Sequence, residues 1–161
     1  MAIGPAFPDE ALERASLALN NHRAKDAERI AADVLRADPR HTRASHILGC
    51  ALLAQGRAED AIALLENAAR GKHDPEIDTV LAMALRRTGR SEDALGRLRR
   101  TTKRHPRFAA AWRELGSLLF ALGHCEEAIE ALTRGLDVAP MMPELSIQLG
   151  YVFLQRRNCT S

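Results

Sequence analysis

Three stretches of this chain repeat one another at an almost constant interval. They read HILGCALLAQGRAEDA over 46–61, TVLAMALRRTGRSEDA over 79–94 and RELGSLLFALGHCEEA over 113–128. Three landmarks recur at steps of 33 and 34 residues: the leucines Leu48, Leu81 and Leu115, the glycines Gly56, Gly89 and Gly123, and the alanines Ala61, Ala94 and Ala128. Landmarks that move together indicate one structural unit repeated along the chain.

Each repeated unit is predicted to be a helix, a short turn and a second helix. Glycine between two helical stretches can adopt the left-handed conformation that ends a helix. Carboxylates follow early in the second helix, where they favour the positive end of its dipole. A proline then disfavours a helical residue before it and ends the unit. The residues concerned are the carboxylates Asp60, Asp93 and Glu127 and the prolines Pro39, Pro106 and Pro140.

Small side chains are predicted to mark the places where two helices approach closely. Gly49, Ala82 and Gly116 follow the repeated leucines directly, and each leaves room for a neighbouring helix. Leu65, Leu98 and Leu132 lie on the second helix of each unit and are expected to fill the core.

This pattern resembles the tetratricopeptide repeat. The copy over 109–142 carries that family's signature at Trp112, Leu115, Gly116, Ala128 and Pro140. The resemblance implies an all-α fold, a right-handed superhelical solenoid of helix-turn-helix repeats. It divides the chain into a repeat domain over 8–161, with repeats at about 8–41, 42–74, 75–108 and 109–142 and the first helix of a fifth from 143, and an N-terminal extension over 1–7.

The first helix of each repeat lines the concave groove in this family. By resemblance, groove positions fall on Leu12, Ser16, His46, Cys50, Thr79, Met83, Arg86, Arg113, Ser117, Phe120, Ile147 and Tyr151. Spacings of four and then three residues place such positions on one helix face. The mixture of polar and apolar side chains suits a peptide ligand, and the two arginines could take a carboxylate or phosphate. Each of these residues could instead only support a neighbouring helix.

No catalytic motif stands out, so we expect no enzyme, cofactor or metal site. Phosphate-binding glycine loops, GxSxG and HExxH are absent from the sequence. The net charge of +2 is too small to imply nucleic acid or an acidic membrane. The three cysteines, Cys50, Cys125 and Cys159, are scattered and odd in number, which argues against a disulfide framework and favours the cytoplasm.

A basic run over 97–107 holds six lysines and arginines on a second helix, hence on the convex side. It is either a solvated helix face or a site for an acidic partner or nucleic acid. Because no aromatic residue interleaves it, nucleic acid is the weaker interpretation.

The leading functional hypothesis is a protein-interaction scaffold that binds a peptide or protein segment in its groove. The alternatives are the N-terminal substrate-recruiting region of a larger enzyme, such as a glycosyltransferase or sulfotransferase, and a nucleic-acid binder. The last helix, 143–156, carries apolar residues almost all round. Such a helix is usually buried on most sides, so we expect a longer protein or self-association at this end.

Overall fold

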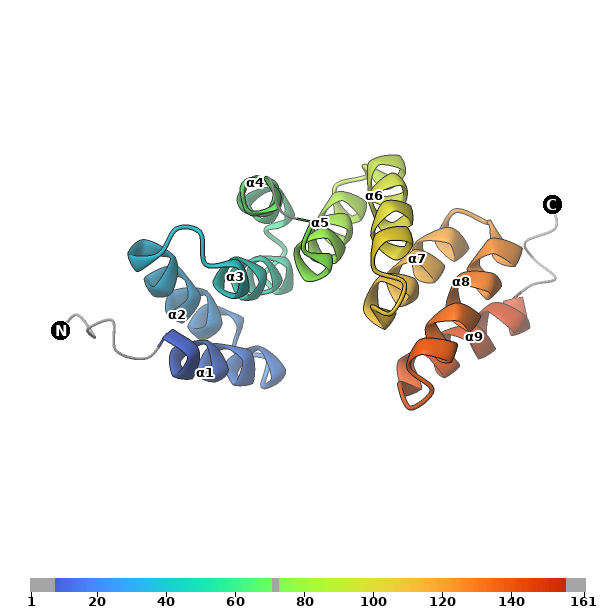
Figure 1. Ribbon diagram of the computed structural model, residues 1–161, viewed down its shortest axis with the longest axis horizontal. Helices are drawn as coiled ribbons and strands as arrows, with labels where there is room; N and C mark the ends of the chain where they lie inside the picture. Colours follow the sequence, from blue (N-terminus) through green and yellow to red (C-terminus); the bar gives the residue numbers. More distant parts are fainter. Residues whose placement is uncertain (1–7, 71–72, 156–161) are drawn as a thin grey trace. The chain divides into compact units, whose positions relative to one another are not determined.

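The computed structural model describes residues 8–70 and 73–155, and these residues form nine α-helices and no strand (Figure 1). The prediction of an all-α helical-repeat fold is therefore confirmed. In chain order the helices are α1 (Pro8–Asn20), α2 (Ala24–Ala37), α3 (Thr42–Ala54), α4 (Ala58–Ala69), α5 (Pro75–Arg87), α6 (Ser91–Arg104), α7 (Ala109–Ala121), α8 (Cys125–Val138) and α9 (Pro143–Gln155).

The helices fall into two compact units, which are described separately. Unit 1 ends at Thr88 and contains α1 to α5, and unit 2 begins at Gly89 and contains α6 to α9. The expected first helices of the repeats are α1, α3, α5, α7 and α9. The division of the chain into repeats stays a prediction.

Left-handed residues end the first helices where the sequence predicts them. Gly56, Gly89 and Gly123 have φ angles of 77°, 81° and 83°, so the glycine prediction is confirmed. In the first repeat the same conformation is adopted by His22, with φ of 57°. A non-glycine residue rarely has positive φ, although histidine tolerates it better than most.

The aspartates in the first turn of three second helices form ion pairs in addition to interacting with the helix dipole. The N-cap arginines of α2, α4 and α6 each pair with an aspartate three residues later, at nitrogen–oxygen distances of 2.8, 2.7 and 2.9 Å: Arg23–Asp26, Arg57–Asp60 and Arg90–Asp93. These pairs are exposed, so each contributes at most about 1 kcal/mol. The same ion pair therefore recurs at the N-terminus of α2, α4 and α6.

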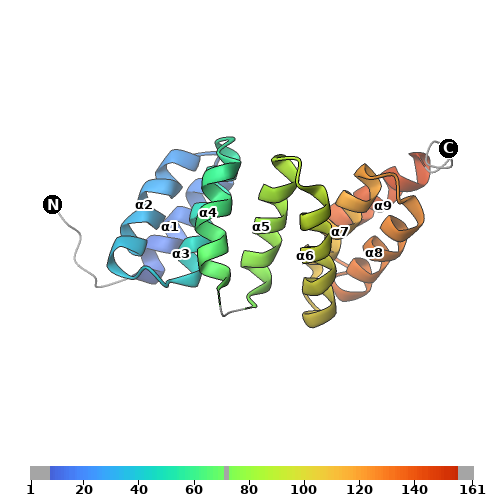
Figure 2. The ribbon, with the colours of Figure 1, turned by 90° about the horizontal axis from the view of Figure 1, so that it is seen from above.

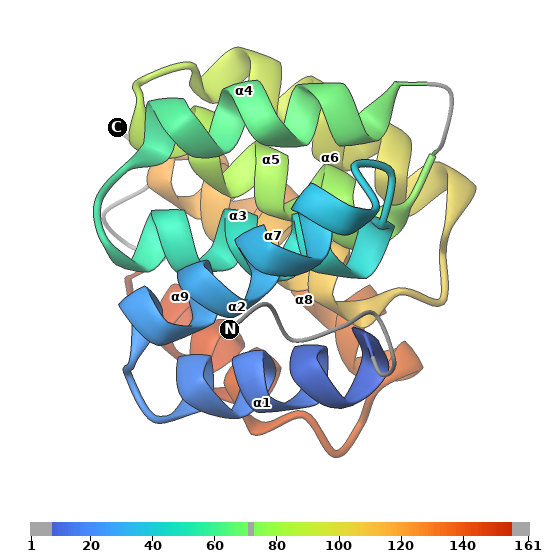
Figure 3. The same cartoon turned by 90° about the vertical axis from the view of Figure 1, so that its left-hand side faces the viewer.

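Unit 1 packs consecutive helices side by side, as Figures 2 and 3 show for α1 to α4. Gly49 allows the close approach, because a Cβ there would lie 2.9 Å from a Leu65 methyl carbon. Polar contacts also join α2 to the turn between α3 and α4. Glu28 on α2 accepts hydrogen bonds from Gln55 at 2.6 Å and Arg57 at 2.7 Å, and those bonds, Gln55 first, lower the pKa of its carboxyl.

Unit 2 repeats this packing around α7 and α8. A Cβ on Gly116 would lie 2.5 Å from Cγ of the fully buried Leu132, so the predicted close helix contact is confirmed. Trp112 anchors the start of α7. Its indole Nε1 donates to the Pro106 carbonyl at 2.9 Å, and the Arg134 guanidinium lies 5.6 Å from its ring centroid.

The cysteines differ from expectation. Cys125 is disulfide-bonded, whereas Cys50 is a free thiol. The scattered spacing of the cysteines, which argued against a disulfide framework, therefore did not anticipate the bond of Cys125.

Candidate functional site

The predicted groove residues of unit 1 come from α1, α3 and α5. These helices are neighbours, since α3 contacts both α1 and α5. The unit 1 surface comprises Ser16, His46, Cys50, Thr79, Met83 and Arg86. Four of these, His46, Cys50, Met83 and Arg86, are half-buried and make no side-chain hydrogen bond to the backbone of the described helices.

Two predicted contact residues are occupied by their own helices. The Thr79 hydroxyl donates to the Pro75 carbonyl at 2.7 Å, and only 5% of Thr79 is exposed. Ser16 is half-buried and donates to the Leu12 carbonyl at 2.9 Å. Leu12, also expected in the groove, is fully buried. Thr79 and Leu12 therefore have almost no exposed surface for a ligand, because both side chains pack inside unit 1.

His46 lies between a thiol and a carboxylate. Its Nε2 is 3.8 Å from Cys50 Sγ, and its Nδ1 is 3.9 Å from Glu76 Oε2. Burial lowers the pKa of His46, although the carboxylates of Glu76 and Asp74 oppose this shift. We therefore describe His46 as a neutral imidazole at pH 7, and the contact with Glu76 as a weak polar one rather than an ion pair.

The His46–Cys50 pair does not support nucleophilic chemistry. Burial, assisted by Glu76, raises the pKa of the Cys50 thiol to about 11. A reactive cysteine needs the opposite shift, because the thiolate is the nucleophile. Among the described residues, no group of three or more histidine, cysteine, aspartate or glutamate side chains could hold a metal ion.

The predicted residues of unit 2 lie on α7 and α9, which contact each other. The unit 2 surface comprises Arg113, Ser117, Phe120, Ile147, Tyr151 and, in addition, Leu154. The Phe120 and Tyr151 rings pack edge to face, with centroids 5.5 Å apart and planes at 80°. The side chains of Ile147, Tyr151 and Leu154 are 70%, 54% and 80% exposed. Sequence reasoning missed Leu154, although one further step of three from Tyr151 finds it.

Arg113 is partly neutralised inside unit 2. One of its terminal nitrogens lies 2.9 Å from the Glu114 carboxylate, whose side chain is only 10% exposed. Arg113 Nε and the Gln148 amide oxygen are both buried without a hydrogen-bond partner among the described residues. Unpaired buried polar atoms are costly, and because these two atoms are buried they are not part of the exposed surface.

A cleft of about 210 Å³ lies between α1 and α2, away from the predicted residues. Its lining is Arg14, Leu17, Ala18, Asn21, Arg23, Asp26, Arg29 and Ile30. Pockets for small ligands usually enclose about 300–1,000 Å³ and are mostly apolar. This cleft is smaller and edged by charged groups, so it does not support a small-molecule site.

Two tetratricopeptide repeat family models match the chain, one over residues 52–115 and the other over 12–75 and 114–160. The chain belongs to the tetratricopeptide repeat family. As a tetratricopeptide repeat protein it is, in general terms, a protein-interaction scaffold. None of its described helices combines the length and apolar character that crossing a membrane requires.

Known relatives agree with this family. The chain is 29% identical over 115 residues to small glutamine-rich tetratricopeptide repeat-containing protein 2 of Mycosarcoma maydis, an alignment that covers 71% of this chain but only 30% of that protein. The solved structure of TTC0263, a thermophilic TPR protein of Thermus thermophilus, is similar with a TM-score of 0.84 and 21% identity, covering 92% and 82% of the two chains. MamA is similar with a TM-score of 0.68 and 22% identity, covering 88% and 84%. At these identities, the structures establish the fold alone.

Proposed function

We propose that this tetratricopeptide repeat protein binds a protein segment on the unit 2 surface, with no catalytic activity of its own. The observation that carries the proposal is the group of exposed apolar side chains Ile147, Tyr151 and Leu154 on α9, with the half-buried Phe120 ring of α7 packed against Tyr151. Contiguous apolar side chains left in water usually mark an interaction site. Tyrosine and phenylalanine are common anchors at such interfaces.

The same surface suggests what kind of segment it binds. An apolar side chain of the ligand would cover the Phe120–Tyr151 pair, and polar backbone groups would meet Arg113 and Ser117 at the other end of α7. Because Arg113 already pairs with Glu114, a strongly acidic ligand is not required. The unit 1 surface contributes fewer exposed groups, since Thr79 is buried and Ser16 bonds to its own helix.

A peptide-display selection tests this proposal, because the natural partner does not have to be known. Peptides selected on the immobilised chain are measured against the wild type and against Ile147→Ser with Tyr151→Ala. Both side chains are more than half exposed, so their loss leaves the fold intact. We expect affinity to fall at least tenfold, about 1.4 kcal/mol.

Leu17→Ser is the matched control, because Leu17 is 61% exposed on α1 and lies outside both surfaces. It should leave the affinity unchanged. Equal affinity for wild type and the Ile147 and Tyr151 variant, or an equal loss in the Leu17 variant, would show that the unit 2 surface is not the site.

A further inference from the structure

The α6 helix carries a cluster of cations that the proposed function does not use. Arg100, Lys103 and Arg104 are spaced by three and four residues, which places them on one side of the helix, and Arg107 follows in the turn after it. All four side chains are exposed. We call these four residues the basic stripe.

Several arginines outside the basic stripe have a carboxylate partner. Arg23, Arg57, Arg90 and Arg134 each pair with a carboxylate three or four residues away on their own helix or turn. None of the four stripe residues has a hydrogen bond or ion pair from its side chain to any described residue. Four cations without a partner among the described residues therefore lie close together, on one helix and the turn after it.

Folding alone does not explain this arrangement. Cations in the last turn of a helix favour the negative end of its dipole, which accounts for Lys103 and Arg104. It does not account for Arg100, which lies a turn earlier, or for Arg107, which lies beyond the helix. Like charges four residues apart, such as Arg100 and Arg104, oppose helix formation. The stripe thus costs the isolated chain some stability.

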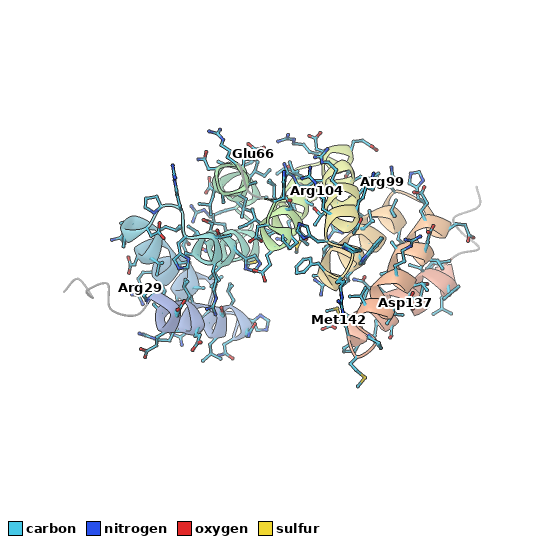
Figure 4. All side chains as sticks on the ribbon, viewed as in Figure 1. Arg29, Glu66, Arg99, Arg104, Asp137 and Met142 are labelled. Atoms are coloured by element: carbon cyan, nitrogen blue, oxygen red, sulfur yellow. The ribbon has the colours of Figure 1, made fainter. Side chains whose placement is uncertain are left out.

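The neighbouring Arg99 gives one example of the chemical group that an arginine of α6 binds. Its guanidinium lies 2.7 Å from the carboxylate of Glu127 on α8, and Figure 4 labels it on α6 together with Arg104. A carboxylate is thus the partner that Arg99 binds within unit 2. Single-stranded nucleic acid is favoured by aromatic side chains among the cations, and α6 has none.

We propose that the basic stripe is a second interaction surface, which binds an acidic protein segment independently of the unit 2 surface. Arginine forms paired hydrogen bonds with carboxylates, so a segment with closely spaced glutamates or aspartates fits the stripe. Since all the contacts are charged and exposed, binding weakens steeply as salt is added.

A labelled alanine-rich helical peptide with glutamates at steps of three and four serves as the probe, with its glutamine counterpart as the neutral control. The test variant is Arg100→Ala, Arg104→Ala and Arg107→Ala together. The matched control is Arg14→Ala, Arg29→Ala and Arg43→Ala, which removes three exposed arginines of unit 1 that have no ion pair among the described residues. Figure 4 labels Arg29, one of the three.

We expect the stripe variant to lose at least tenfold in affinity for the acidic probe, and the control variant less than twofold. Melting temperatures separate binding from folding, because removing like charges should leave the stripe variant at least as stable as wild type. The Ile147 and Tyr151 variant should keep full affinity for the probe, so failure here is distinct from failure of the proposed function.

Three results would overturn the inference. The glutamine peptide could bind as tightly as the acidic one, or both arginine variants could lose affinity equally. A short oligothymidine could also bind the stripe more tightly than the acidic peptide, which would assign the surface to nucleic acid.

Discussion

Replacing Gly116 by alanine should destabilise unit 2, although the same change in an exposed helix is stabilising. The added Cβ would lie 2.5 Å from Cγ and 2.8 Å from Cδ2 of Leu132, and 3.3 Å from the Ala128 carbonyl oxygen. Carbon atoms in good contact are about 3.5–4.0 Å apart, so Leu132 or the backbone of α8 must move by about 1 Å. Leu132 is fully buried, so its movement would disturb the close packing of the core around it.

The expected loss is about 1–3 kcal/mol, the usual cost of overpacking a core. For a chain of this size it corresponds to a melting temperature lower by roughly 2–12 °C, measured by circular dichroism. Gly116→Leu should cost more, since it adds further atoms at the same contact.

Gly96→Ala is the matched control, because Gly96 lies within α6 and a Cβ there meets nothing within 4 Å. It should stabilise the protein by about 1 kcal/mol through helix propensity. Adding Leu132→Ala to Gly116→Ala should cost less than the two single changes summed, because the clash is removed. A Gly116→Ala protein as stable as the Gly96→Ala protein would refute the close contact between α7 and α8.

Further predictions concern titration, reactivity and association. Because burial lowers the pKa of His46, the unfolded chain binds a proton at this imidazole more readily than the folded chain does. The free energy of unfolding, measured with urea, should therefore fall as pH drops from about 7.5 to about 5. The fall should be smaller in His46→Asn. An identical pH dependence in both proteins would contradict that assignment. With its pKa near 11, Cys50 should be alkylated by iodoacetamide at pH 8 at least about tenfold more slowly in the folded than in the urea-unfolded chain, judged by mass spectrometry of its fragment. Comparable alkylation rates in the folded and unfolded chains would show that the Cys50 thiol is not buried as described. Phe153 and Leu154 on α9 are 51% and 80% exposed, so we expect the chain to associate as its concentration rises. The double change Phe153→Ser and Leu154→Ser should reduce this association. Light scattering that reports a single chain at every concentration would exclude the association.

The sequence predicted the fold well because the repeat places the same residues in the same environment several times. Gly56 and Gly123 occupy left-handed turns, and Leu65 and Leu132 are fully buried, as their repeat positions required. A landmark repeated at a constant interval reports both helix boundaries and core positions. The first repeat was harder, since His22 takes the turn conformation without being a glycine.

The candidate site was less predictable, because a position on the first helix does not determine what its side chain contacts. Thr79 has the right spacing, but its hydroxyl bonds to the preceding turn and the residue is buried. Arg113 has the right charge, but Glu114 neutralises much of it. These outcomes depend on rotamers and neighbouring helices, which periodicity does not specify. The cytoplasmic location inferred from the cysteines stays a prediction.

An NMR titration of the chain with a selected peptide tests most directly whether the unit 2 surface is the binding site. We predict that the side-chain signals of Phe120, Ile147 and Tyr151 shift with peptide concentration. The signals of Val138 and Ile129 on α8 should stay in place, since α8 contributes no residue to that surface. Shifts confined to α8, with the three surface residues unchanged, would contradict the account.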